Sequence, residues 1–561
     1  MRYLAPAILW CLTASAQTPV PTADSSPSVK PEDKCSVEGT VLSATTGEPL
    51  KKARLVLQTE KPAKVYRAIS DGSGHFVLVG IDPGRYHFHS ARNGYLMQFY
   101  PTSKGPWPTF TLSPGQKLTE IIFRLTPQGV ITGRVLDEDR EPVPSAVVQC
   151  LALVYENGKR QFRMEQGRAA NDIGEFRIID LKPGRYIVSA WDQLERYQLE
   201  TQPGANSTSS AGPLKEGHIS TYYPNTVRPE AATFIDVTAG AQVNGIEITL
   251  AHTRTARVTG RISLVDSARP LPSDRLYEIG LVLLPRAGSH FALDHFSGRV
   301  EDTEGNFEIS GVIPGSYVLH ADFMDEDKRY TARAPVEVID SNVAGVELKL
   351  QATAEINGRV ILDKNGDLSG AALSVDLQAR DFEFRPPTAE VKDLSFRLAN
   401  VDLHSYDINV RAMPEWFYIK SIHLGQLDVT ETGLDFTQGV LPGDMTIVLN
   451  PNGGQINGSV HNAKDEPATD STVTLIPDES HRSLTWMYKT AQTDKNGHFN
   501  IKGVRPGEYT IYAWEGIEKG AYEDPDFMKP HESEGEKVSI KESTHETMQL
   551  KVIPAETSGK E

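Results

Sequence analysis

Hydrophobic and polar residues alternate with a period of two along most of the chain, and this pattern predicts β-strands. Around Phe176 and Ile178, and again around Phe307 and Ile309, every second side chain is apolar, as a strand with one buried face requires. Turn residues recur between these segments, and no segment keeps a helical period for more than a turn or two. The chain is therefore expected to be all-β and built from small β-sandwiches.

Two short motifs repeat along the chain. Asp-x-x-Gly-x-Phe predicts a tight hairpin turn, because Asp bonds its own backbone and Gly accepts a positive φ. Pro-Gly-x-Tyr predicts a second turn, followed by a Tyr that packs inward with its hydroxyl at the rim. In the second copy Asp172 stands one residue closer to Gly174, and in the fourth copy Leu403-His404 replaces Pro-Gly. Each copy keeps the same Phe-to-Tyr spacing: Phe76 and Tyr86, Phe176 and Tyr186, Phe307 and Tyr317, Phe396 and Tyr406, Phe499 and Tyr509.

Each copy opens with a Gly-x-Val or Gly-x-Ile strand, which marks where one repeat begins. These glycines are Gly39, Gly133, Gly260, Gly358 and Gly458. Their spacing of about a hundred residues predicts one domain per repeat, joined by short linkers. The predicted sandwiches span residues 35–126, 127–252, 253–352, 353–452 (degenerate) and 453–554, with 555–561 as a tail.

The N-terminus has the features of an export signal. Arg2 precedes an apolar stretch from Tyr3 to Leu12, and Ala14-Ser15-Ala16 fits a cleavage site. Residues 1–16 are therefore predicted to be a signal peptide, and the Pro-, Ser- and Thr-rich residues 17–34 a disordered leader. The mature chain has no apolar run near the roughly 20 residues of a membrane helix. The protein is expected to be periplasmic, secreted or at the cell surface.

Composition and charge narrow the possible partners. Lys and Arg number 57 against 74 Asp and Glu, a net charge of −17, so the surface repels phosphate backbones and nucleic-acid binding is not expected. Once the signal peptide is removed, two cysteines remain, Cys35 and Cys150. Their spacing leaves open whether they pair.

Together the motifs resemble those of the carboxypeptidase regulatory-like domain. The first two copies add Glu-Pro-x-x-x-Ala, at Glu48-Pro49 with Ala53 and at Glu141-Pro142 with Ala146. The resemblance covers nearly all of residues 35–554. It implies five tandem transthyretin-like (prealbumin-like) β-sandwich domains, close to collagen-adhesin B-type repeats and within the carbohydrate-binding-like fold group. A fold of this kind does not by itself define an activity.

Catalytic and metal-binding signatures are weak. The single His-x-x-Glu run starts at His531 in a polar loop, and no His-Glu-x-x-His, Gly-x-Ser-x-Gly or Gly-x-x-x-x-Gly-Lys run occurs. Residues 363–367 and 494–497 resemble fragments of a calcium loop but lack its final Glu, and turns explain both. The protein is expected to be a non-enzyme with no catalytic residue, metal or cofactor.

Aromatic residues are the candidate ligand-binding residues. Trp191 and Trp514 follow the inward Tyr of their repeats by five positions, so strand parity places them on the opposite face, where they should be exposed or semi-exposed. Tyr100, Trp107 and Trp416 lie in aromatic stretches of the first and fourth copies. Such rings can stack on sugars, and they can equally cover a sandwich end or contact a neighbouring domain.

The sequence therefore predicts an exported array for binding or presentation at the cell envelope. A polysaccharide or cell-surface glycan is the leading ligand class, by fold resemblance and aromatic placement. Two alternatives stay open: a structural spacer or adhesin that binds an envelope protein, and an accessory subunit of a secreted hydrolase or peptidase. A sugar binder should expose rings on equivalent faces of several copies, whereas a spacer should bury them at the junctions.

Overall fold

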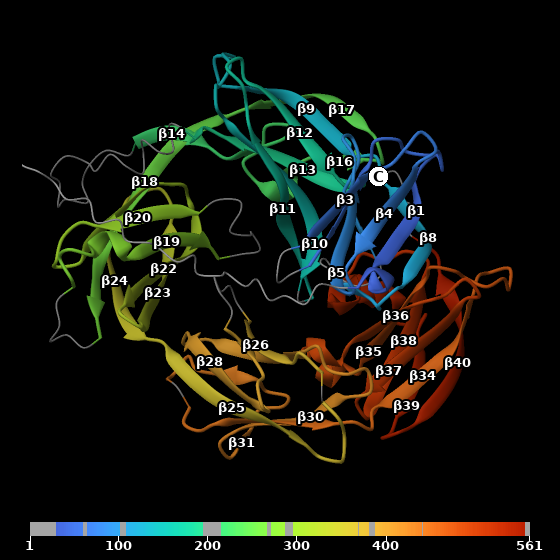
Figure 1. Ribbon diagram of the computed structural model, residues 1–561. Helices are drawn as coiled ribbons and strands as arrows, with labels where there is room; N and C mark the ends of the chain where they lie inside the picture. Colours follow the sequence, from blue (N-terminus) through green and yellow to red (C-terminus); the bar gives the residue numbers. More distant parts are fainter. Residues whose placement is uncertain are drawn as a thin grey trace, which may run out of the picture. The chain divides into compact units, whose positions relative to one another are not determined.

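Strands make up nearly all of the regular structure in a computed structural model of the chain (Figure 1). The described residues are 30–59, 64–100, 108–156, 158–193, 215–265, 271–286, 295–368, 370–380, 387–439 and 441–555. The predicted signal peptide, most of the predicted leader and Trp107 lie outside them. By its internal contacts the chain divides into two compact units, Met1–Gln128 and Gly129–Glu561. In the described residues, no helix is long and apolar enough to cross a membrane.

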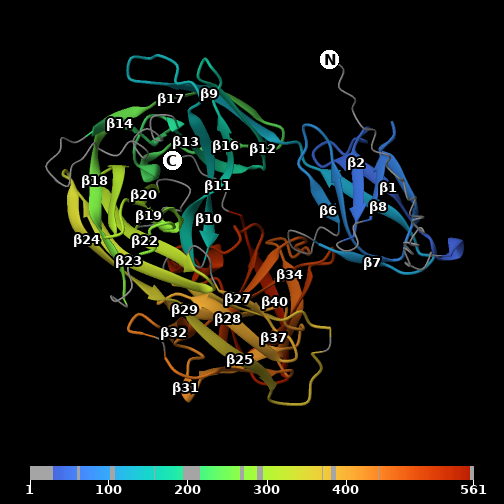
Figure 2. The ribbon, with the colours of Figure 1, turned by 60° about the vertical axis from the view of Figure 1, so that its left-hand side comes forward.

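The first unit is one sandwich of two facing sheets (blue in Figure 2). In the smaller sheet β1 lies between β4, which runs antiparallel to it, and β8, which runs parallel. In the larger sheet β2 and β5 form the centre. The strands are β1 (Cys35–Ser43), β2 (Arg54–Gln58), β3 (Val65–Ile69), β4 (His75–Ile81), β5 (Gly84–Ala91), β6 (Gln98–Tyr100), β7 (Phe110–Leu112) and β8 (Lys117–Leu125), after a short 3₁₀ turn, η1 (Pro31–Asp33).

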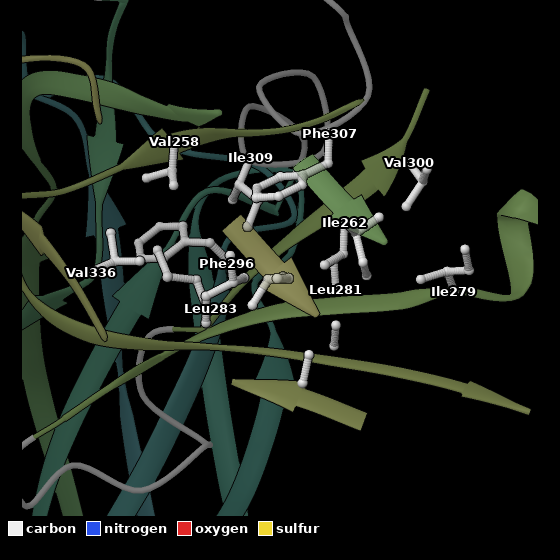
Figure 3. Close-up of a cluster of buried hydrophobic side chains, with 14 of the residues drawn as sticks. Val258, Ile262, Ile279, Leu281, Leu283, Phe296, Val300, Phe307, Ile309 and Val336 are labelled. Carbon is white, nitrogen blue, oxygen red and sulfur yellow. The ribbon is translucent and has the colours of Figure 1, made fainter. Parts of the chain in front are cut away.

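The second unit repeats this plan four times. The first strand of each sandwich again lies between an antiparallel and a parallel neighbour, in the orders β12-β9-β17, β21-β18-β24, β28-β25-β33 and β37-β34-β40. Each sandwich has its own apolar core, and Figure 3 shows that of the third, where Phe296 and Phe307 meet Val258 and Ile262. The prediction of tandem all-β sandwiches is confirmed.

The elements of the second and third sandwiches are as follows. The second contains β9 (Gly129–Leu136), β10 (Val147–Glu156), β11 (Lys159–Ala169), β12 (Glu175–Leu181), β13 (Gly184–Trp191), β14 (Lys215–Ile219), β15 (Thr221–Tyr222), η2 (Pro229–Ala231), β16 (Ile235–Val237) and β17 (Gln242–Thr249). The third contains β18 (Ala251–Leu264), η3 (Leu276–Glu278), β19 (Gly280–Pro285), β20 (Phe296–Val300), β21 (Asn306–Val312), β22 (Gly315–Asp325), β23 (Lys328–Val338) and β24 (Val343–Ala352).

The fourth and fifth sandwiches follow in the same way. The fourth contains β25 (Ala354–Leu362), β26 (Ser374–Ala379), β27 (Thr388–Glu390), β28 (Ser395–Val401), β29 (Ser405–Arg411), β30 (Tyr418–Leu424), β31 (Leu427–Asp428), β32 (Leu434–Asp435) and β33 (Met445–Asn450). The fifth contains β34 (Gly454–His461), β35 (Thr472–Pro477), η4 (Glu479–His481), η5 (Thr485–Met487), β36 (Lys489–Gln492), β37 (His498–Val504), β38 (Gly507–Trp514), η6 (Ala521–Glu523), α2 (Pro525–Met528), η7 (Lys529–His531), β39 (Glu536–Ile540) and β40 (His545–Ile553).

The glycine of each Gly-x-Val strand marks a place where a side chain has no room. In four sandwiches a Cβ there would overlap a carbonyl oxygen of the parallel neighbour, and in the fourth sandwich it would overlap the ring of Phe396. The repeated Phe is the cross-strand partner of this glycine. Its ring therefore covers the glycine backbone, which has no side chain of its own to cover it. The pairs are Gly39 and Phe76, Gly133 and Phe176, Gly260 and Phe307, Gly358 and Phe396, and Gly458 and Phe499.

The Tyr of the second motif closes the turn before it. Its ring is buried in every sandwich, and its hydroxyl donates to the carbonyl oxygen four residues earlier over 2.6 to 3.0 Å. Burial raises the pKa of Tyr186 to about 12, so this hydroxyl remains a donor at physiological pH. The predicted inward ring with its hydroxyl at the rim is confirmed. The bonds run from Tyr86 to Asp82, Tyr186 to Lys182, Tyr317 to Ile313, Tyr406 to Asp402 and Tyr509 to Arg505.

The Asp-x-x-Gly-x-Phe turn forms the predicted hairpin in the third sandwich, where β20 and β21 pair antiparallel with Val300 opposite Phe307. In the first, second and fifth sandwiches it does not, because the strands on its two sides pair with different partners. In the first sandwich β3 pairs with β2 and β4 pairs with β1, so the turn carries the chain from one sheet to the facing sheet. The Asp71 carboxylate still shapes it by accepting the N–H groups of Ser73 and His75.

In the second sandwich the turn residue is Asn171 and not Asp172. The side-chain oxygen of Asn171 accepts the N–H groups of Ile173 and Glu175. The second copy therefore has the ordinary spacing, with an amide oxygen in place of a carboxylate.

The two cysteines are separate free thiols. Cys35 is buried in the core of the first sandwich and Cys150 in the core of the second. Burial raises the pKa of the Cys150 thiol well above its usual range, which makes it a poor nucleophile while the protein is folded.

Replacing Gly39 by Ala should destabilise the first sandwich by about 2–4 kcal/mol, because strand β8 must move to admit a Cβ. Hydrogen exchange of the full chain should show lost protection in β1, β4 and β8. Gly72→Ala is the matched control, since no atom lies within 4 Å of the added Cβ. Equal protection in the two variants would contradict the close approach.

Candidate functional site

Trp514 is buried, contrary to the sequence prediction. Its indole stacks on Tyr512 with ring centroids 5.6 Å apart, and its Nε1 donates to Thr474 at 2.9 Å. The predicted side of the strand is correct, because Tyr509 faces the core and Trp514 lies on the opposite face of the sheet. That face is covered by the segment containing α2, whose Phe527 ring lies 5.9 Å from the indole. The exposure was mispredicted because a segment between β38 and β39 folds back over the sheet.

The other candidate aromatics belong to different sandwiches. Trp191 is half-buried at the end of β13, on a sheet face where Tyr222 packs against Ile187. Tyr100 packs beside the first core, with its ring 5.6 Å from Phe110. Trp107 lies outside the described residues.

Trp416 lies where the fourth and fifth sandwiches meet. The side chain is 40% exposed. Lys502 of the fifth sandwich lies 5.0 Å over its ring, and His545 approaches its edge at 6.5 Å. This candidate therefore belongs to a joint between sandwiches, where charged and aromatic side chains of the two domains meet.

The joint between the fourth and fifth sandwiches combines an aromatic bridge with a buried amide. Trp486 packs against the cores of both sandwiches, and the Arg505 guanidinium lies 5.4 Å over its ring. Asn450, 1% exposed, donates to Asp363 of its own sandwich at 2.9 Å and to Glu542 of the next at 2.8 Å. One amide therefore ties two domains.

The joint between the third and fourth sandwiches is a buried polar cluster. Asp402 accepts the hydroxyl of Thr331 at 3.2 Å and lies 3.9 Å from Arg329. Arg333 donates to the imidazole of His404 at 2.7 Å. His404 is in the turn where the other copies carry Pro-Gly, so the degenerate motif of the fourth copy supplies contacts to its neighbour.

Burial sets the charge states in this cluster. His320 pairs across β22 and β23 with Arg333 and is 7% exposed. Its burial lowers the pKa of the imidazole to about 3, and the charges of Arg333 and Arg329 and the nearby His404 act in the same direction. Burial raises the pKa of the Asp402 carboxyl, and Arg329 opposes that rise. His320 is therefore neutral at physiological pH.

The joint between the second and third sandwiches is a two-stranded ribbon. The first half of β18 pairs with β14, from Lys215 opposite Thr255 to Ile219 opposite Ala251, and its second half opens the third sandwich. His218 and His252 face each other across the ribbon with ring centroids 5.1 Å apart. The Glu138 carboxylate lies 2.8 Å from His218 and anchors the ribbon to the second sandwich.

Two motifs with possible chemistry have structural roles. Within the described chain, no group of three or more His, Cys, Asp and Glu side chains is arranged to hold a metal ion. His531 lies 2.6 Å from Glu534 and contacts the Trp514 ring edge-on, so the His-x-x-Glu run is part of the segment that covers β38. Asp494 accepts the N–H groups of Asn496 and His498 and thus shapes a turn.

Two family models match parts of the chain. Residues 36–126 match the carboxypeptidase regulatory-like domain. The chain carries a carboxypeptidase regulatory-like domain in its first unit. Residues 468–544, in the fifth sandwich, match domain II of polysaccharide lyase family 4. No curated protein matches. The regulatory-like domain includes the first Gly-x-Val strand and both turn motifs of its sandwich.

Three solved structures that resemble parts of this chain are a Bacillus anthracis protein and two streptococcal pilins. The Bacillus anthracis TIE protein is 12% identical, with 57% of this chain and 51% of that chain covered and a TM-score of 0.16. A streptococcal ancillary pilin is 9% identical over 57% and 99% of the two chains, with a TM-score of 0.18. GBS52, the minor pilin of Streptococcus agalactiae, is 13% identical over 39% and 97%, with a TM-score of 0.19. The chain spans about half the length of the TIE protein.

The third sandwich should lose stability as the pH falls from about 6.5 towards 3. Between these pH values His320 is protonated in the unfolded chain and neutral in the folded protein, because burial lowers its pKa to about 3. Acid therefore favours unfolding. By pH 4 this loss amounts to about 3 kcal/mol. Hydrogen exchange of β22 and β23, corrected for the intrinsic effect of pH, measures it. The loss should disappear in His320→Gln and persist in His498→Gln, an exposed control. Parallel pH curves for the wild type and His320→Gln would refute the assignment.

Proposed function

We propose that the protein is an exported, non-enzymatic scaffold that holds sandwich domains in a fixed array at the cell envelope. The observation that carries this proposal is the bridging of each successive junction in the second unit by ordered contacts. They are the β14–β18 ribbon, the cluster around His404 and Arg333, and the Asn450 and Trp486 contacts. Buried polar groups bonded across a joint favour one arrangement, since any other would leave them unpaired.

The locations of the candidate aromatic residues also favour a scaffold. Trp514 is buried under a covering segment, and Trp416 lies at a joint. Neither ring is an open platform, although only Trp416 lies at a junction, as expected of a structural array, and that ring is partly exposed. The regulatory-like domain type of residues 36–126 supports a non-catalytic role. Export is supported by the signal-like N-terminus, with Arg2 before an apolar stretch and Ala14-Ser15-Ala16 after it.

Limited proteolysis of the mature protein tests whether the joints are closed. Trypsin should cut slowly at Lys349 and Arg359, which flank the junction of the third and fourth sandwiches. His404→Ala should speed this cleavage several-fold, because Arg333 loses its partner across the joint. His498→Ala, at an exposed site away from this joint, should leave the rate unchanged. Wild-type cleavage as fast as that of His404→Ala would contradict the proposal.

Glycan binding is the second candidate function. The match of residues 468–544 to a domain of polysaccharide lyases favours it, and Trp191 is half-buried, as is its neighbour Asp192. The role of an accessory subunit for a secreted hydrolase stays an alternative prediction.

Tryptophan fluorescence titrated with soluble polysaccharides separates the aromatic roles. If Trp191 stacks on sugar, a saturable shift should appear and be lost in Trp191→Ala, while the melting temperature stays nearly unchanged. Trp514→Ala should instead lower the melting temperature by several degrees, because it empties a packed cluster. No shift with any polysaccharide would rule out Trp191 as a stacking platform.

A further inference from the structure

An open cleft of about 510 Å³ lies at the joint between the fourth and fifth sandwiches. Glu415 and Phe417 line its side on the fourth sandwich. Lys489, Asn500 and Lys502 are among the residues that line it on the fifth. Both sandwiches belong to the second unit, so the cleft is a feature of one compact body.

Lys489 is a cation without a partner at this cleft. It begins β36 opposite Leu475, a residue of the fifth core, and Ala491 on the same side of β36 also packs against that core. Burial lowers the pKa of its amine. Within the described part of the chain, the Lys489 amine takes part in no hydrogen bond or ion pair. The side chain as a whole is half-buried, so its ammonium group stands partly withdrawn from water and open to the cleft, and an anion bound there would give it the partner that it lacks.

The other groups at the cleft are suited to a sugar. Lys502 is already paired with Glu415 at 2.9 Å, so these two charges cancel and Lys489 supplies the excess positive charge. Asn500 accepts a hydrogen bond from Gln455 at 2.8 Å, which occupies its oxygen and leaves its amide nitrogen as a donor. Thr490 lines the cleft and is exposed, and its hydroxyl both donates and accepts.

Trp416 adds an apolar surface at the edge of the same cleft. It lies next to Glu415 and Phe417 in the chain, is 40% exposed and contacts Lys502, a lining residue. An aromatic face beside hydrogen-bonding side chains and a cation suits a carboxylated sugar, because sugar hydroxyls bond to amide and hydroxyl groups such as those of Asn500 and Thr490.

We propose that this cleft binds a carboxylate-bearing glycan, with the Lys489 ammonium as the partner of the carboxylate. Asn500 and Thr490 bond sugar hydroxyls, and Trp416 offers its ring to a sugar face. A charge-assisted hydrogen bond to Lys489 is the strongest single contact in this arrangement. The site gives the second candidate function a location and does not depend on the scaffold role.

Calorimetric titration of the mature full-length protein with oligogalacturonate tests the site. Lys489→Met keeps the aliphatic stem and removes the charge, so it should weaken binding at least tenfold. Lys489→Arg keeps the charge and should retain measurable binding. Lys495→Met, in an exposed turn of the same sandwich, is the matched control and should bind as the wild type does. Uncharged dextran oligomers should bind weakly or give no heat.

A second measurement does not depend on how well the Met variant folds. In protein with ¹³C-methylated lysines, the Lys489 resonance should titrate below the ordinary lysine range, and bound oligogalacturonate should shift its titration to higher pH. An unshifted resonance, or equal affinities of wild type and Lys489→Met, would overturn the site. Equal binding of poly-L-glutamate would overturn the assignment to a glycan. None of these results bears on the scaffold role, which proteolysis at the joints tests separately.

Discussion

Each sandwich depends on one close approach, in which a glycine backbone passes a neighbouring strand with no space for a side chain. Across the first sheet the glycine meets a Phe ring, as in Gly458 with Phe499. This pair sets the register of three strands, and the Tyr ten residues later closes the following turn with its hydroxyl. The Phe and Tyr keep their spacing in all five copies because both are tied to the same sheet crossing.

The joints are built where the copies differ from one another. His404 stands in place of a turn glycine and meets Arg333 of the preceding sandwich. The long strand β18 serves first as a ribbon partner and then as the opening strand of the third sandwich. Asn450 ends its strand with an amide that bonds into the next sandwich. The positions that the five copies share therefore hold each domain together, and positions that differ between copies hold neighbouring domains to one another.

Sequence reasoning found the features that depend on local physics. Alternation, turn chemistry and parity correctly placed the Phe and Tyr rings of every copy in the cores. Sequence reasoning failed where contacts with segments distant in the chain decide whether a side chain is buried or paired. Nothing near Trp514 indicates that Phe527 folds over it, and nothing in Leu403-His404 reveals that Arg333 lies opposite. Asn171 was missed because Asp172, beside it, appeared to complete the motif. The partnerless state of Lys489 also depends on which side chains surround it, which spacing alone does not give.

The central claim is that buried contacts hold neighbouring sandwiches of the second unit in one arrangement. Spin labels at Ile339→Cys in the third sandwich and Glu390→Cys in the fourth test it by pulsed electron resonance. Both native positions are exposed, and Cys35 and Cys150 are buried, so the added thiols are the ones that take the label. The account predicts one narrow distance distribution, which broadens in His404→Ala. A broad distribution in the otherwise unmodified protein would contradict it.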